Sequence, residues 1–100
     1  MIHIVWEFEI VAGSEAEFEK HYGPDGTWVR LFRRDPAFRG TQLLRDRENL
    51  NRYITIDQWD DLSSYDAFRE QFAEEYQNLD LRMEKLTAKE TKLGIFENLE

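Results

Sequence analysis

Residues 2–22, IHIVWEFEIVAGSEAEFEKHY, decide the fold class, because a strand pattern runs directly into a helix pattern. Along residues 2–11 the side chains alternate with the two-residue period of a β-strand. One face of this strand is strongly apolar and carries Ile2, Ile4, Trp6, Phe8 and Ile10. The first predicted element is therefore a strand with one face packed against a core.

The segment after this strand predicts a helix. Ser14 and Glu17 have the spacing of a capping box at a helix start. Three larger side chains then share one side of the helix by the three- and four-residue rule: Phe18, His21 and Tyr22.

This helix is interrupted by Gly23-Pro24-Asp25-Gly26, and a second helix begins near Thr27 and stops at Asp35-Pro36. Two new helix ends and two glycines are unfavourable compared with one continuous helix. We therefore expect the break to form the rim of a cavity, with His21 and Trp28 angled inward. The alternative is a kink that only lets the helix follow a curved sheet.

The rest of the chain predicts two strands, a long helix and a last strand. Residues 38–46 and 53–59 are typical of a hairpin with a longer loop. Asp60, Asp61 or Ser63 then caps a helix, which residues 80–88 continue or kink, and residues 91–97 form the last strand. The apolar stripe of this helix consists of Leu62, Tyr65, Phe68, Phe72, Tyr76 and Leu79.

The order of elements is β-α-β-β-α-β, which predicts an α+β fold of the ferredoxin-like split type, with an antiparallel sheet and the helices on one face. Ile54 and Ile56 point away from Tyr53, Thr55 and Trp59, so both sheet faces are partly apolar. An uncovered apolar sheet face normally marks an interface. We expect one domain over residues 1–100 and a homodimer joined through the bare sheet face.

Composition excludes several classes of function. The net charge of −8 argues against nucleic-acid binding, which needs a basic surface. There is no cysteine, and no apolar run approaches the roughly 20 residues of a membrane span. The first residues, MIHIVWEFEI, lack the basic start of a signal peptide. We therefore expect a cytoplasmic protein without membrane or nucleic-acid partners.

Four stretches carry a resemblance that spans almost the whole chain: VWEFEIVAGSEAEFEKHYGPDGTW, GTQLLRD, RYITIDQW and SSYDAF. The sequence resembles the antibiotic biosynthesis monooxygenase domain, within the dimeric α/β-barrel superfamily. This resemblance implies the same fold and a dimer. Known members include quinone-forming oxygenases that use no metal or organic cofactor, haem degraders, and proteins of no established activity.

The resemblance can be compared residue by residue with these branches. The haem degraders carry an asparagine in strand one and an axial histidine in the last helix, where this chain has Trp6 and Phe72. Phenylalanine cannot ligate iron, so haem degradation is disfavoured. The quinone-forming branch resembles this chain in the six-residue spacing of Trp59 and Tyr65, but its asparagine four residues before the tryptophan is replaced by Thr55.

Together these features predict an aromatic cavity between helices and sheet, suited to a flat phenolic or quinonoid ligand. His21 and Asp57, which shares a strand face with Thr55 and Trp59, are the candidate catalytic residues, each able to act as a general base. The candidate substrate contacts are Trp6, Tyr22, Trp28, Thr55, Trp59, Tyr65 and Phe72. Aromatic side chains at these spacings also fill ordinary cores, which remains the alternative.

Two function classes remain open at this point. The first is a cofactor-independent monooxygenase, in which His21 or Asp57 deprotonates a small phenol or hydroquinone that then reacts with O₂. The second is a ligand-binding or structural dimeric barrel without turnover. No metal site is expected, because His3 and His21 are far apart in sequence and show no paired-ligand spacing. Convergence of His21 and Asp57 on one cavity would favour the enzyme.

Overall fold

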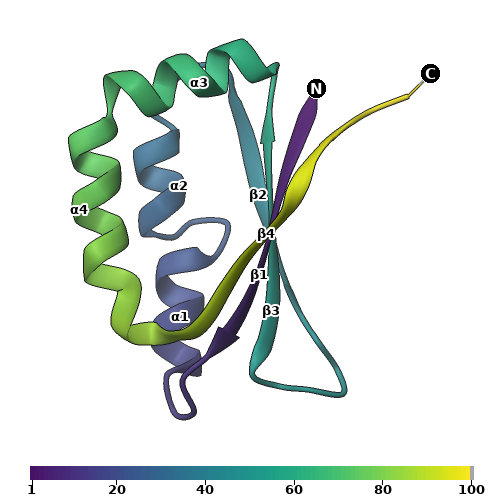
Figure 1. The fold of residues 1–100 in the computed structure, drawn as a ribbon, viewed down its shortest axis with the longest axis vertical. Helices are drawn as coiled ribbons and strands as arrows, with labels where there is room; N and C mark the ends of the chain where they lie inside the picture. Colours follow the sequence, from purple (N-terminus) through teal and green to yellow (C-terminus); the bar gives the residue numbers. More distant parts are fainter. Residues whose placement is uncertain (100) are drawn as a thin grey trace.

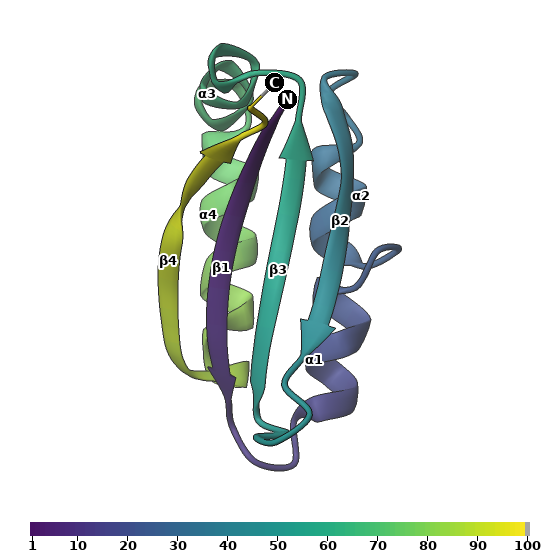
Figure 2. The ribbon, with the colours of Figure 1, turned by 90° about the vertical axis from the view of Figure 1, so that its right-hand side faces the viewer.

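Four strands form one antiparallel sheet in the order β2-β3-β1-β4 (Figure 2). A computed structural model describes residues 1–99. The strands are β1 (Ile2–Ile10), β2 (Phe38–Arg45), β3 (Arg52–Trp59) and β4 (Thr87–Glu97). The two central strands, β1 and β3, are paired from Ile2 opposite Trp59 to Glu9 opposite Arg52. The predicted strands are confirmed, although β4 begins four residues earlier than expected.

All the helices lie on one face of this sheet, as Figure 1 shows with the sheet seen edge-on. They are α1 (Glu15–Tyr22), α2 (Thr27–Phe32), α3 (Leu62–Gln71) and α4 (Ala73–Met83), followed by the short 3-10 helix η1 (Glu84–Leu86). The ferredoxin-like β-α-β-β-α-β fold is therefore confirmed. None of the helices among residues 1–99 is long and apolar enough to cross a membrane.

The core lies between the sheet and the helices, and the alternation along β3 positions it. Tyr53, Thr55, Asp57 and Trp59 are buried on the helix side, whereas Ile54 and Ile56 are only partly covered. The most completely buried large side chains are Trp59, Tyr53, Phe18, Phe68 and Ile4. Asp57 is thus a carboxyl group placed in an aromatic core.

The expected break between the first two helices is present and is imposed by close backbone packing. A Cβ atom on Gly26 would lie 2.6 Å from the carbonyl oxygen of His21, and one on Gly23 would lie 2.7 Å from that of Glu19. Only glycine fits such gaps without a backbone shift. The Gly23 amide donates to the Glu19 carbonyl at 3.0 Å and so closes the end of α1.

Two local predictions were wrong. Ser14 makes no capping hydrogen bond, because its backbone (φ −98°, ψ 11°) is not in the extended conformation that aims an N-cap side chain at the helix amides. The long helix is not continuous, since Phe72 (φ −108°, ψ 28°) separates α3 from α4 and turns the chain sharply (Figure 1). Of the three candidate caps for α3, Asp61 is the one used, accepting from the Ser64 amide at 2.8 Å.

The sheet face away from the helices remains partly apolar. Val5, Ile54 and Ile56 are half-buried there. Leu44 pairs with Ile54 on the neighbouring strand, and 49% of its surface is exposed. No helix of residues 1–99 covers this face (Figure 2).

Candidate functional site

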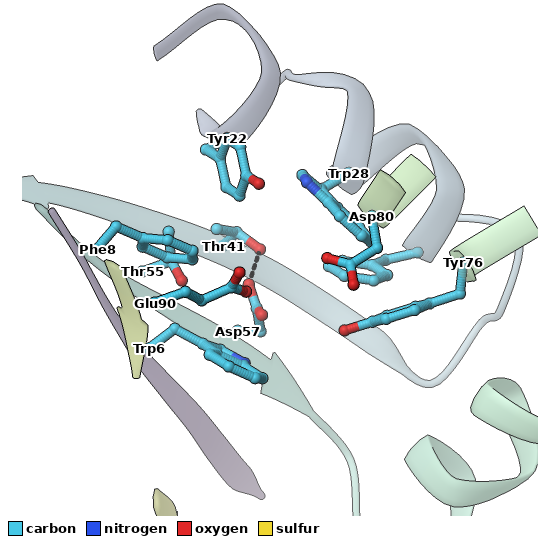
Figure 3. Close-up of a pocket in the computed structure, with 11 residues that line it drawn as sticks. Trp6, Phe8, Tyr22, Trp28, Thr41, Thr55, Asp57, Tyr76, Asp80 and Glu90 are labelled. Carbon is cyan, nitrogen blue, oxygen red and sulfur yellow. Dashed lines mark hydrogen bonds between the residues drawn. The ribbon is translucent and has the colours of Figure 1, made fainter. Parts of the chain in front are cut away.

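A cavity opens between the sheet and helices α2 and α4, and six aromatic side chains line it: Trp6, Phe8, Tyr22, Trp28, Phe32 and Tyr76 (Figure 3). All four strands and three helices contribute to it. Its free volume is about 30 Å³, which is room for roughly one water molecule. Trp6 and Tyr76 are the only two of these six rings that are not fully buried.

Asp57 lies at the base of this cavity on β3. Thr41 faces it from β2 in the register of the sheet, and its hydroxyl donates to Oδ1 of Asp57 at 2.6 Å. Burial raises the pKa of Asp57 to about 6, and the Thr41 hydrogen bond opposes part of that rise. Asp57 is therefore a carboxyl group that exchanges a proton close to neutral pH.

Two more carboxylates lie at the mouth of the cavity. Asp80 comes from α4 and Glu90 from β4, and both residues are exposed. Partial burial of the Glu90 carboxyl, together with the negative charge of Asp80, raises the pKa of Glu90. The mouth is therefore acidic.

The polar groups of the aromatic lining are mostly hydrogen-bond donors. Burial raises the pKa of Tyr22 and of Tyr76 well above the usual value, so both phenols remain protonated. The indole Nε1 of Trp28 is buried and makes no hydrogen bond of ordinary geometry among the described residues, although it approaches the Tyr22 hydroxyl and opposes part of the rise in the pKa of Tyr22. A ligand oxygen in the cavity would find a donor there.

His21 lies elsewhere. Its Nδ1 is 2.7 Å from the Thr27 hydroxyl and its Nε2 is 3.3 Å from a Glu17 carboxylate oxygen. It borders a separate hollow beside the end of α4, lined also by Arg82 and Lys85. The expectation that His21 and Trp28 border one void is therefore wrong, and so is the expected convergence of His21 with Asp57. Each helical residue is rotated by about 100° from the last, so Tyr22 faces the cavity and His21 does not.

Three of the expected substrate contacts belong to the core instead. Trp59 and Tyr65 touch each other, with ring centroids 5.4 Å apart, but neither lines the cavity formed by the described residues. Phe72 packs on Phe68 at 5.1 Å and under the guanidinium of Arg34. The six-residue spacing of Trp59 and Tyr65 thus reflects a packing contact across the end of β3. Trp6, Tyr22, Trp28 and Thr55 do line the cavity, together with Asp57.

Sequence reasoning missed Thr41, Tyr76, Asp80 and Glu90. Thr41 is placed by the β2–β3 register, which a single sequence does not specify. Tyr76 was assigned to a core stripe, and Asp80 follows it by four residues on the same face of α4. Glu90 lies just before the strand predicted for residues 91–97, yet in the structure it belongs to β4 and pairs with Phe8 on the cavity side.

The position of His21 gives a first prediction. A His21→Ala variant loses the hydrogen bond to Thr27 that bridges the helix break, which is worth about 1 kcal/mol. We expect its melting temperature to fall by about 5 °C. Ligand binding in the cavity should not change. Thermal unfolding and ligand titration of this variant test both statements.

The matched control is Lys20→Ala, which removes an exposed side chain from the same helix and should leave the melting temperature unchanged. Weaker ligand binding by His21→Ala at full stability would contradict the assignment of His21 to the helix break.

The described residues show no group of three or more histidine or acidic side chains arranged to hold a metal ion. Asp57, Asp80 and Glu90 line the same cavity without forming such a cluster. Their arrangement suits proton transfer at Asp57 and attraction of positive charge at the mouth.

The family model described as antibiotic biosynthesis monooxygenase matches residues 1–79. That segment contains β1 to β3, α1 to α3 and most of α4, and therefore all of the cavity except Asp80 and Glu90. No curated protein matches the sequence significantly.

Solved structures resemble the whole fold. A point variant of SnoaB, a cofactor-independent oxygenase from Streptomyces nogalater, has a TM-score of 0.81 and 24% identity over 99% of this chain and 93% of that one. A candidate antibiotic biosynthesis monooxygenase from Bordetella bronchiseptica has a TM-score of 0.79 and 22% identity over 99% and 97%. An uncharacterized NIPSNAP domain protein from Burkholderia xenovorans has a TM-score of 0.72 and 23% identity over 99% and 95%. At such identities the likeness establishes the fold alone.

Proposed function

The chain belongs to the antibiotic biosynthesis monooxygenase family, and from that premise we propose that it is a cofactor-independent monooxygenase acting on a small phenol or hydroquinone in the aromatic cavity. The observation that carries the proposal is Asp57, a buried carboxyl group among aromatic rings whose pKa is raised to about 6. A base with a pKa near the working pH is well matched to taking a proton from a phenol. The likeness to SnoaB, an oxygenase described as cofactor-independent, agrees with this chemistry.

The proposed reaction converts a phenol and O₂ into a quinone and water. The carboxylate of Asp57 takes the phenolic proton, and the electron-rich ring then transfers electrons to O₂ and forms a carbon–oxygen bond. The resulting peroxide anion takes the proton held by Asp57 and becomes a hydroperoxide. The ring hydrogen then leaves as a proton while the O–O bond breaks. One oxygen atom stays on the ring as a carbonyl, and the other leaves as hydroxide, which combines with that ring proton to form water. The substrate supplies all four electrons.

The chain's own groups would favour the charged species in this sequence. The Trp28 indole N–H makes no hydrogen bond of ordinary geometry among the described residues, so it can donate to the phenolate oxygen in place of its weak contact with Tyr22. The buried rings of Phe8 and Phe32 exclude water from the reacting centre. A ring enters only if the side chains of Trp6 or Tyr76, which are partly exposed, move outward.

The small volume of the cavity favours the second candidate function, a ligand-binding or structural barrel without turnover. An oxygen electrode separates the two. We expect purified protein to consume O₂ with members of a panel of hydroquinones and phenols, forming one quinone per O₂, in the presence of a chelator and without added cofactor. Tight binding of these compounds without O₂ uptake would reject the oxygenase.

We further infer that a second copy of the chain covers the bare sheet face. Val5, Ile54, Ile56 and Leu44 form an apolar row on that face, and burying it against its own copy removes it from water.

An Ile56→Lys variant tests this dimer. A lysine without a partner at the centre of the interface is expected to weaken dimerisation by about a hundredfold or more. Sedimentation velocity at micromolar concentration should show a dimer for the parent protein and a monomer for the variant. Glu70→Lys, which places the same charge on the exposed side of α3, is the control. A monomeric parent protein would refute the inferred interface.

A further inference from the structure

The charge of the cavity is one-sided. Three of its lining residues are carboxylic acids, Asp57, Asp80 and Glu90, and none of the described lining residues is basic. The guanidinium of Arg69 is nearby, but it lies over the ring of Tyr76 at 3.8 Å and donates to the Tyr65 hydroxyl at 2.9 Å. The carboxylates at the mouth therefore have no cation of their own within the cavity.

The carboxylates of Asp80 and Glu90 approach the cavity from opposite sides, one from α4 and one from β4, as Figure 3 shows. Burial raises the pKa of Glu90, and the negative charge of Asp80 on the other side of the mouth adds to that rise. A positive group between them would relieve the repulsion.

Trp28 adds a polar group to the cavity wall. This residue is 7% exposed, and its buried indole N–H makes no hydrogen bond of ordinary geometry among the described residues, although it lies close enough to the Tyr22 hydroxyl to lower the pKa of that phenol. Figure 3 shows the nitrogen edge of its ring on the cavity side, toward Tyr22. Buried donors are nearly always paired in proteins, so a ligand oxygen with better geometry than the Tyr22 hydroxyl can accept a hydrogen bond from this group.

The aromatic lining adds a second attraction for positive charge. The faces of tryptophan and tyrosine rings attract cations, and the attraction grows when the site is shielded from water. Trp6, Trp28 and Tyr76 line the cavity together with Asp57 (Figure 3). Apolar walls combined with carboxylates at the entrance match a molecule that carries both a ring and an ammonium group.

We propose that the cavity selects a hydroxyphenyl-alkylamine in its cationic form, with the ammonium group between Asp80 and Glu90 and the ring hydroxyl reaching Trp28 and Asp57. This assignment names the substrate class for the proposed oxygenase and rests on that function only for turnover. Binding itself depends on the charges and rings of the cavity alone.

Three probes of similar size test the proposal, all sharing a para-hydroxyphenyl ring: tyramine, which is cationic; 4-ethylphenol, which is neutral; and 3-(4-hydroxyphenyl)propionate, which is anionic. Calorimetric titration should show tyramine binding about tenfold or more tightly than 4-ethylphenol, with the anion weakest. Equal affinity of tyramine and 4-ethylphenol, or no binding of tyramine, would overturn the proposal.

The double variant Asp80→Asn, Glu90→Gln should lose most of the preference for tyramine while its affinity for 4-ethylphenol stays within about twofold. Glu74→Gln, which neutralises an exposed carboxylate on α4 outside the cavity, should keep the preference. A preference that survives in the double variant would also overturn the proposal.

The same titrations separate this proposal from the proposed oxygenase. Selective binding of tyramine without O₂ uptake supports the cationic ligand and rejects the oxygenase. O₂ uptake with 4-ethylphenol, combined with equal affinity for tyramine, supports the oxygenase and rejects the cationic ligand.

Discussion

An Asp57→Asn variant is expected to lower the rate of O₂ uptake by about a hundredfold or more, because it removes the group proposed to take the phenolic proton. Asparagine has nearly the same shape, and its carbonyl oxygen can still accept the hydrogen bond from Thr41. The cavity should therefore remain intact, and ligand affinity should change much less than the rate. Oxygen-electrode kinetics and calorimetric titration measure the two effects separately.

The pH dependence of the parent protein should identify the same group. Turnover needs the ionised carboxylate, so the rate should rise with pH through about 6, where Asp57 titrates. A Thr41→Val variant loses the hydrogen bond that favours the ionised form, so its profile should move to higher pH. A parent profile that is flat between pH 5 and pH 7 would contradict the role of Asp57.

The stability of the folded protein should change with pH in the opposite direction to the rate. The folded-state pKa of Asp57 is raised from 3.8 to about 6, so the folded protein holds this proton more strongly than the unfolded chain does. Stability is therefore lost as pH rises from about 4 to about 6, by roughly 3 kcal/mol on this group alone. The Asp57→Asn variant lacks this loss. Urea unfolding at several pH values should show that the free energy of unfolding of Asp57→Asn increases relative to that of the parent protein as the pH rises across that window.

Replacing Trp59 by alanine is expected to lower the free energy of unfolding by about 3–5 kcal/mol, a large part of the stability of a domain of this size. Trp59 is fully buried, and its ring packs between Phe32, Phe38 and Phe68. Its removal leaves a void that these rings cannot fill. Denaturant unfolding by circular dichroism measures the loss.

The conservative variant Trp59→Phe distinguishes packing from substrate contact. The indole Nε1 of Trp59 is buried without a hydrogen-bond partner among the described residues, so its removal offsets part of the lost packing. We expect Trp59→Phe to lower stability by less than half as much as Trp59→Ala, with little change in the Michaelis constant. A large rise in the Michaelis constant with stability preserved would indicate that Trp59 contacts the substrate.

The fold could be predicted from the sequence because its signals are local. The alternation along residues 2–11 and 53–59 and the break at Gly23–Gly26 specify strands and helix ends without knowledge of distant contacts. The helix end at Phe72 could not be predicted, since the apolar stripe continues through it and no glycine or proline marks it. The failed capping box at Ser14 likewise depends on backbone angles that the residue types do not determine.

The site was only partly predictable, because it depends on long-range register and on the rotation of each helix. Asp57 was placed correctly from the alternation of β3. His21 and Tyr22 belong to the same broad side of α1, but only Tyr22 faces the cavity. His21 borders a separate hollow beside the end of α4, and the residue spacing alone does not distinguish the two directions. Glu90 reaches the site only through the pairing of β4 with β1, across most of the length of the chain.

The central position of β1 has a consequence for how the chain folds. This strand precedes both of its neighbours in the chain, since Val5 pairs with Ile56 on one side and Gly94 on the other. During synthesis its apolar face stays uncovered until those later strands emerge from the ribosome, which exposes it to off-pathway association. Such distant pairings also slow refolding relative to helical proteins of similar length. We expect the hairpin of β2 and β3, whose pairing is local, to form before β1 pairs with β4.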